Sequence, residues 1–195
     1  MLTLGLSAVA LVSFCLITAV PALSQALPGL PPLRKAPELS FKLPGGAQRQ
    51  LSQYKGKVVA LEFILTTCPH CQNAAKVFSK LYAEYGSKGF QPVGVAFNEA
   101  NELKVSDFVK ATGATYPIGY AEREAVLRFL SLTEKDRFVV PQIIWIDRAG
   151  NIRSQTPPMG EEKMLQEPFW REMIETLLKD HSTPAPVRRT TAAKH

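Results

Sequence analysis

Apolar positions along the middle of the chain follow two alternating patterns. The first is a nearly continuous apolar run at 57–65, which is typical of a strand covered on both faces. After Pro69, apolar residues recur at spacings of three and four as far as Tyr85, which predicts a helix that Gly86 can end. A buried strand that leads directly into a helix is therefore expected.

The alternation of strand and helix patterns continues to residue 179. Further strands are predicted from short apolar runs at 90–97, 116–119, 138–147 and, as the hairpin partner of the last, 152–154. Further helices are predicted from apolar residues at helical spacing at 105–111, 122–130 and 169–179. This order predicts an α/β fold with a mixed central sheet flanked by helices.

The first 33 residues carry no charged side chain and are mostly apolar. A long apolar run that ends in small residues, with a cleavage point between about Ser24 and Leu27, is typical of an export signal. A run of about 20 apolar residues is also long enough to span a bilayer. Residues 1–26 are therefore expected to be a signal peptide or, if uncut, an N-terminal membrane anchor, with cleavage favoured.

The rest of the chain is expected to form one domain between two irregular ends. Residues 27–44 hold five of the 15 prolines, which predicts an extended, Pro-rich lead-in. Residues 181–195 are rich in Ser, Thr, Pro and Ala with basic residues among them, which predicts a disordered basic tail. The domain itself is expected at 36–180.

The composition fits one globular domain with an ordinary core. The chain has 195 residues, of which 46% are apolar and 21% are charged. The net charge is +6, but no basic stripe interleaved with aromatic residues points to a nucleic-acid partner. Three cysteines are too few for a disulfide scaffold or a four-cysteine zinc site. If residues 1–26 are removed, only Cys68 and Cys71 remain.

The candidate chemistry lies in the motif Cys68-Pro69-His70-Cys71, where the first predicted strand meets its helix. The N–H groups and dipole of a helix N-terminus favour a thiolate at Cys68. Pro69 is tolerated in the first turn, where no N–H is needed. A protonated His70 would add a positive charge beside the thiolate. Cys71, one turn further on, is expected to be the resolving thiol that attacks a mixed disulfide.

Three other uses of the cysteine pair are weaker. Zinc needs about four ligands, and beyond Cys68, Cys71 and His70 the chain offers only two histidines in the tail. Covalent haem attachment needs a His directly after the second Cys, where this chain has Gln72. A merely structural disulfide is the third alternative.

Two further positions complete the candidate site. Glu62 stands inside the apolar strand, where an ionised carboxylate is costly, and we expect it to accept the proton of Cys71. The alternative is a side chain at the strand edge that faces solvent. Pro141 opens an otherwise apolar strand, which is unusual in a sheet interior. A cis Val140–Pro141 bond would explain it and would place the Val140 backbone beside the thiols, where it could pair with a substrate strand.

Glu62, the Cys68–Cys71 motif and Val140-Pro141, in this order, resemble the thioredoxin superfamily over about residues 36–178. The phrases at 36–39 and 51–59 are similar to the opening of its exported TlpA/ResA-like branch of redoxin or AhpC-TSA type. Pro141 lies 70 positions after Cys71. This leaves room for that branch's additional strand and helix between the motif helix and the proline strand, but not for the inserted helical domain of DsbA. The resemblance implies a thioredoxin-like fold and a cis Val140–Pro141 bond.

Two features depart from the TlpA pattern. Thr67 stands where TlpA-like sequences usually carry Trp, and the Pro69-His70 dipeptide is the one found in strongly oxidising DsbA-type proteins. The overall sequence thus resembles a branch dominated by reductases, whereas the motif resembles an oxidase. The direction of electron flow stays open.

The resemblance implies an exported thiol–disulfide oxidoreductase, with a TlpA/ResA-like reductase slightly favoured over a DsbA-like oxidase. Cys68 and Cys71 would form the redox disulfide, so no bound cofactor or metal is required. The expected substrates are protein thiols and disulfides, and a membrane redox partner would reset the pair. The protein is expected to be a monomer in the bacterial periplasm or at the outer face of the membrane.

Two alternatives on related folds belong to other functional classes. A peroxiredoxin places Pro seven and Thr three residues before its reactive Cys, where this chain has Leu61 and Leu65. A copper chaperone or non-enzymatic binding module of this fold usually adds a distant His, and no His lies between His70 and His181. Both patterns fit less well than thiol–disulfide exchange.

Overall fold

The computed structural model describes residues 34–98 and 102–180, and the structural statements that follow concern these residues. The predicted signal or anchor at 1–26 and the predicted tail at 181–195 lie outside them, as does the first part of the predicted lead-in. Within the described ranges, none of the helices combines the length and the apolar character needed to cross a membrane.

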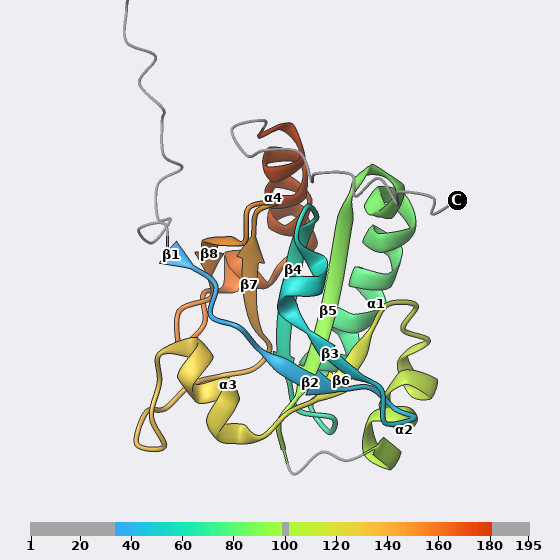
Figure 1. The fold of residues 1–195 in the computed structure, drawn as a ribbon, viewed down its shortest axis with the longest axis vertical. Helices are drawn as coiled ribbons and strands as arrows, with labels where there is room; N and C mark the ends of the chain where they lie inside the picture. The colour runs from blue at the N-terminus through green and yellow to red at the C-terminus, as the bar shows by residue number, and fades with distance from the viewer. Residues whose placement is uncertain (1–33, 99–101, 181–195) are drawn as a thin grey trace, which may run out of the picture.

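One mixed sheet of eight strands, in the order β1-β8-β7-β4-β5-β6-β2-β3, forms the centre of the domain (Figure 1). The strands are β1 (Arg34–Lys35), β2 (Ser40–Lys42), β3 (Gln48–Gln50), β4 (Val58–Ile64), β5 (Phe90–Ala96), β6 (Ile118–Tyr120), β7 (Gln142–Ile146) and β8 (Asn151–Gln155). Strands β4, β5 and β6 are parallel, whereas β7 is antiparallel to both β4 and β8. The predicted mixed sheet is therefore confirmed.

Helices pack on both faces of the sheet. The helices are α1 (Pro69–Tyr85), α2 (Glu102–Thr112), α3 (Arg123–Leu130) and α4 (Glu167–Lys179), with 3₁₀ turns η1 (Leu51–Tyr54), η2 (Gly86–Lys88) and η3 (Glu162–Leu165). On one face α1, α2 and α4 share a core, in which Phe78 stacks on Trp170 with ring centroids 4.5 Å apart. On the other face α3 contributes Phe129, whose ring centroid lies 5.3 Å from that of Phe63 in β4.

Strand β4 is buried along its whole length because both of its faces are covered. Successive side chains of a strand point to opposite faces of the sheet. Accordingly, Ala60 and Ile64 join the core with α1, whereas Leu61 and Phe63 join the core with α3. Glu62 lies between Ala60 and Ile64 in this alternation, so it points toward the helix that begins at the cysteine motif.

One predicted boundary was wrong. Strand β7 begins at Gln142 rather than at 138, because Pro141 has no N–H to donate to a ladder. The first helix ends at Tyr85 with Gly86 as its C-cap, as predicted, and Gly86 keeps a right-handed φ of −59° and leads into η2. The left-handed turn that reverses the chain falls at Gly89, where φ is +103°.

The N-terminal segment adds three short strands that the hydrophobic pattern did not predict. Strand β1 pairs with β8, and the β2–β3 hairpin joins the sheet through β6. Part of the predicted lead-in therefore belongs to the sheet. Gly119 allows β6 and β2 to approach closely, because a Cβ atom at that position would lie 2.4 Å from the carbonyl oxygen of Lys42.

Between α1 and β7 the chain forms β5, α2, β6 and α3. The predicted additional strand and helix fall within this stretch, and their status as an addition to a smaller fold stays a prediction.

Candidate functional site

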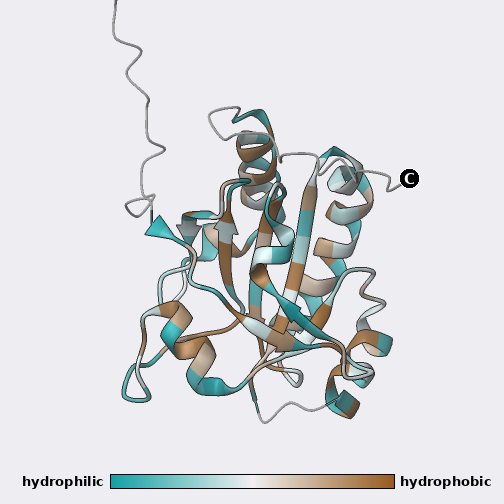
Figure 2. Ribbon diagram, viewed as in Figure 1, coloured by the Kyte–Doolittle hydropathy of each residue, from teal (hydrophilic) through white to brown (hydrophobic). Residues whose placement is uncertain are grey.

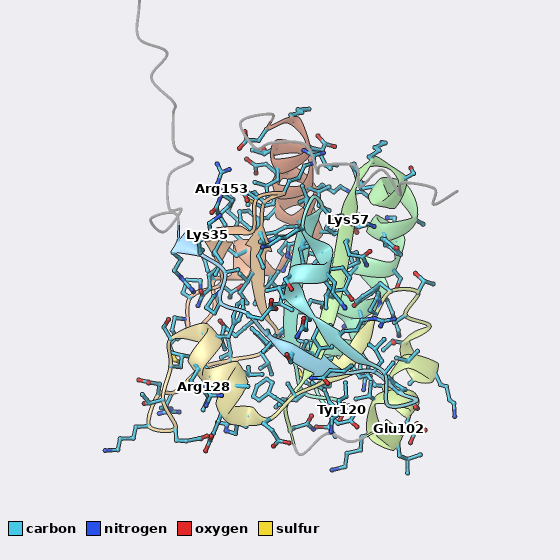
Figure 3. All side chains as sticks on the ribbon, in the orientation of Figure 1. Lys35, Lys57, Glu102, Tyr120, Arg128 and Arg153 are labelled. Carbon is cyan, nitrogen blue, oxygen red and sulfur yellow. The ribbon has the colours of Figure 1, made fainter. Side chains whose placement is uncertain are left out.

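The cysteine motif lies at the end of the sheet where the parallel strands β4, β5 and β6 terminate (Figure 1). In Figure 3, Lys57, which precedes β4, lies in the upper part of the view, and Tyr120, which ends β6, lies in the lower part. Strand β4 ends at Ile64 and α1 begins at Pro69, so the four residues between them form the turn that carries Cys68.

Cys68 is the N-cap residue of α1 and is partly exposed. Its Sγ accepts a hydrogen bond from the backbone N–H of Cys71 at 3.4 Å. The sulfur thus occupies the position where orphan N–H groups and the helix dipole favour negative charge. Both cysteines are free thiols in the structure. Cys68 is thus the more accessible thiol of the pair, and its role as the thiol that attacks a substrate stays a prediction.

Cys71 is the buried member of the pair, with none of its surface exposed. Its side chain belongs to the core between α1 and the sheet. Burial raises the pKa of this thiol, and the neighbouring Cys68 and Glu62 raise it further. Cys71 is therefore a weak acid in the dithiol form and needs a base before it can act as a nucleophile.

Glu62 lies on the same side of the sheet and is only 1% exposed, so the alternative of a solvent-facing side chain was wrong. Its burial raises the pKa of the carboxyl to about 8, while a hydrogen bond from the Tyr116 hydroxyl partly offsets this rise. The hydroxyl donates to Oε1 at 2.5 Å. The second oxygen, Oε2, is buried and has no hydrogen-bond partner among the described residues.

Tyr116 is the site residue that the sequence pattern did not identify. It is 6% exposed and precedes β6, and burial together with Glu62 raises the pKa of its hydroxyl well above the usual value. The hydrophobic pattern places Tyr116 only as the first residue of a strand. Its pairing with Glu62 depends on the neighbouring positions of β4, β5 and β6 in the sheet, and the buried carboxylate, which requires a donor, was the one available signal.

The Val140–Pro141 peptide bond is cis, as the resemblance implied. The carbonyl oxygen of Val140 lies 3.9 Å from Sγ of Cys68, although the two residues are 72 positions apart. The buried side chain of Gln142 donates to the carbonyl oxygen of Val139 at 2.9 Å. The N–H of Val139 donates to the carbonyl oxygen of Pro158 at 2.8 Å. These bonds fix the loop before β7 to itself and to the segment after β8.

An aromatic cluster supports the same loop. Phe138 stacks on Phe97 at the end of β5, with ring centroids 5.9 Å apart. The guanidinium of Arg123 lies over both rings at 5.6 and 5.7 Å and pairs with Glu134 at 2.9 Å. The loop is therefore anchored on both sides of Val139.

Pro69 and His70 are both exposed in the first turn of α1. Pro69 occupies the first helical position, as predicted, where its missing N–H costs no hydrogen bond. His70 follows it, adjacent in sequence to the buried Cys71. In the part of the chain that the structure describes, no three His, Cys, Asp or Glu side chains are grouped so that they could hold a metal ion.

A family model described as the AhpC/TSA family matches residues 32–155. Several curated relatives are named thiol-disulfide oxidoreductase ResA, and two of them illustrate the similarity. The protein from Geobacillus kaustophilus is 29% identical over 108 residues, which are 55% of this chain and 59% of that protein. The protein from Halalkalibacterium halodurans is 38% identical over 73 residues, which are 37% of this chain and 41% of that protein. The chain thus spans less than two thirds of the length of these relatives.

A solved structure supports the fold. The thiol:disulfide interchange protein, a thioredoxin family protein from Chlorobium tepidum, superimposes with a TM-score of 0.61 at 24% sequence identity. The match covers 74% of this chain and 95% of that protein. The predicted thioredoxin-like fold is confirmed.

Proposed function

The chain belongs to the AhpC/TSA family, and on this premise we propose that it is a thiol–disulfide oxidoreductase of the TlpA/ResA type. One observation carries the proposal: a partly exposed Cys68 caps α1 while Cys71, one turn further, is buried on the side of β4 that holds Glu62. One thiol is therefore accessible to a substrate, and the other is kept protonated beside a buried carboxyl. This division of roles is what a two-step exchange requires.

In the reductase direction, the Cys68 thiolate attacks one sulfur of a substrate disulfide. A mixed disulfide forms, and the other substrate sulfur leaves as a thiolate. Glu62 then takes the proton of Cys71, and the Cys71 thiolate attacks Sγ of Cys68. The substrate leaves reduced by two electrons, and the protein is left with a Cys68–Cys71 disulfide. In the oxidase direction the same steps run in reverse, starting from attack by a substrate thiolate on Cys68.

The remaining site residues position the reactants. Pro69 starts the helix whose N-terminus stabilises the Cys68 thiolate, and His70 in its protonated form adds positive charge to that turn. Pro141 holds the Val140 carbonyl beside Cys68. A substrate strand that paired with the backbone of Val140 would bring its own sulfur to the reactive thiol.

The proposed setting is outside the cytoplasm. A signal or anchor at 1–26 would deliver the domain at 36–180 to the periplasm or the outer face of the membrane, where disulfides persist. The substrates would be protein thiols and disulfides, and a membrane redox partner would reset the pair. No bound cofactor is needed, because the electrons stay on the two sulfurs.

Single cysteine substitutions test the function. We expect Cys68→Ser to abolish reduction of a protein disulfide such as that of insulin, because no nucleophile reaches the substrate. Cys71→Ser should form a mixed disulfide that persists and can be seen by mass spectrometry. Cys15→Ser, which removes the only other cysteine of the chain, is the matched control and should keep full activity. Full activity of the Cys68 variant would disprove the mechanism.

The reduction potential of the Cys68–Cys71 pair decides the direction. Equilibration with glutathione should give about −270 mV if the protein reduces its substrates, as thioredoxin does. A value near about −120 mV would mean that it donates disulfides, as DsbA does.

A further inference from the structure

The Tyr116–Glu62 contact joins two elements that are far apart in sequence. Glu62 is in the middle of β4, and Tyr116 lies two residues before β6, on the far side of β5. The register places Glu62 opposite Gly94, which pairs in turn with Ile118. Because Gly94 has no side chain, nothing on β5 stands at the position between Glu62 and the segment that carries Tyr116.

The two oxygens of Glu62 have different surroundings. Oε1 accepts the hydroxyl proton of Tyr116 at 2.5 Å, whereas Oε2 is buried without a partner in the described ranges. Because Oε1 already accepts a hydrogen bond from the Tyr116 hydroxyl, the lone pair used in that bond is not available to bind the proton of the carboxylic acid. A proton taken up by Glu62 is therefore directed to Oε2.

We propose that Tyr116 is a positioning residue for the exchange reaction, because its hydroxyl occupies Oε1 of Glu62 and leaves Oε2 as the oxygen that takes the proton of Cys71. The inference rests on the proposed function, and it assigns to Tyr116 a role that acts only through Glu62. During the second step, the proton moves from Sγ of Cys71 to Oε2. The Cys71 thiolate then attacks Sγ of Cys68, and the substrate thiolate leaves.

Among residues 34–98 and 102–180, two titratable groups face Glu62. Helix α1 contributes Cys71, and the segment before β6 contributes Tyr116. The neighbours of Glu62 in β5 and β7 are Gly94 and Ile143, which carry no charge. Cys71 and Tyr116 both have a pKa raised above the usual value by burial, so Glu62 is the first of the three to ionise as the pH rises.

The hydrogen bond from Tyr116 stabilises the ionised form of Glu62 and so lowers its pKa relative to burial alone. Without this bond, a smaller fraction of Glu62 is ionised at neutral pH and able to accept a proton. Tyr116→Phe keeps the ring and removes only the hydroxyl. We expect the pH profile of the second step to shift upward by about one unit, which lowers its rate about tenfold at pH 7.

The matched control is Tyr85→Phe. Tyr85 also donates its hydroxyl to a glutamate, Glu175, at 2.8 Å. It lies 14 residues after Cys71 on α1, which is about 21 Å along the helix axis. Loss of this bond should leave the pH profile of the exchange unchanged.

The experiment measures the rate at which Cys71 resolves a mixed disulfide between pH 6 and pH 10, in full-length wild type, Tyr116→Phe, Tyr85→Phe, Glu62→Gln and Glu62→Gln/Tyr116→Phe. An upward shift for Tyr116→Phe that disappears in the Glu62→Gln background would support the proposal. An equal fall in rate at every pH, or the same effect with and without Glu62, would overturn it, because a merely structural role predicts that result.

A second measurement tests the proposal even if Tyr116→Phe does not fold. The infrared C=O band of the protonated Glu62 carboxyl, identified in wild type by its absence in Glu62→Gln, should shift when 3-fluorotyrosine replaces tyrosine and makes the hydroxyl a stronger donor. An unchanged band would overturn the proposal. If the wild-type protein reduced no disulfide at all, the proposed function itself would fail, whereas an active wild type with an unshifted Tyr116→Phe profile would remove only the role of Tyr116.

Discussion

Glu62→Gln should change how the stability of the domain depends on pH. Burial raises the pKa of Glu62 from 4.5 to about 8 in the folded protein. Below about pH 4.5 the carboxyl is neutral in both the folded and the unfolded state, so its titration costs no stability. Between about pH 4.5 and about pH 8, Glu62 has lost its proton in the unfolded chain but keeps it in the folded protein. The free energy of unfolding therefore falls as the pH rises through this range.

The size of the effect follows from the width of that range. Each pH unit costs about 1.4 kcal/mol, so the loss is about 3 kcal/mol at pH 7 and about 5 kcal/mol above pH 8. Because the carboxyl is 1% exposed, solvent screening does not reduce it. Glutamine stays neutral and removes the slope. Its buried amide N–H₂ adds a constant cost of about 1 to 3 kcal/mol. We therefore expect wild type to be the more stable protein at pH 5 and Glu62→Gln at pH 8.

Urea unfolding at half-unit steps from pH 5 to pH 9 would measure this, in reducing buffer so that both cysteines stay thiols. The two tryptophans of the chain, Trp145 and Trp170, are both buried and report unfolding by fluorescence. Glu124→Gln on α3 is the control, because this side chain is 81% exposed and should leave the slope unchanged. Parallel curves for wild type and Glu62→Gln would refute the assigned pKa of Glu62.

Three further changes test other parts of the structure. Phe78→Ala removes a fully buried ring that stacks on α4 and should lower the free energy of unfolding by about 3 to 5 kcal/mol; a loss below about 1 kcal/mol would contradict the packing. Gly119→Ala places a Cβ atom 2.4 Å from the Lys42 carbonyl oxygen and should lower the melting temperature, so an unchanged value would contradict the β2–β6 pairing. His70→Asn should slow alkylation of Cys68 by iodoacetamide at pH 7 about two- to tenfold, and an unchanged rate would exclude His70 as a source of positive charge.

The sequence predicts the parts of the site that are close together along the chain. The strand at 57–65, the helix after Pro69 and the cysteine pair between them are one continuous segment, so their local pattern determines their arrangement. Glu62 was singled out because an ionised carboxylate is costly inside an apolar strand. The unusual Pro141 at the start of an apolar run suggested a cis bond that would place Val140 beside the thiols, and the resemblance then implied the same bond.

Two other features that depend on distant neighbours, the Tyr116–Glu62 contact and the short strands at 34–50, were not predicted. Strand β5 lies between β4, which carries Glu62, and β6, which follows Tyr116. Tyr116 contacts Glu62 across β5 because the β5 residue opposite Glu62 is Gly94, which has no side chain. The strands at 34–50 are two or three residues long and mostly polar, so they carry no hydrophobic period. Their pairing is determined by the strands β8 and β6 that they join. The start of β7 was misplaced because the apolar pattern continues through Val140 while the hydrogen-bond ladder does not.

The two outermost strands of the sheet have a consequence for self-association. Strand β1 is the pair Arg34–Lys35 and β3 is Gln48–Gln50, which are the outermost strands in the order of the sheet. Both are coloured as hydrophilic segments in Figure 2. Short, charged margins are poor templates for another chain, whereas long apolar ones invite aggregation. If the domain has the proposed function, it would meet incompletely folded proteins with reactive sulfurs, and these margins would keep it from adding their strands to its own sheet. Backbone pairing would then be directed to the loop before β7, beside the Cys68 thiol.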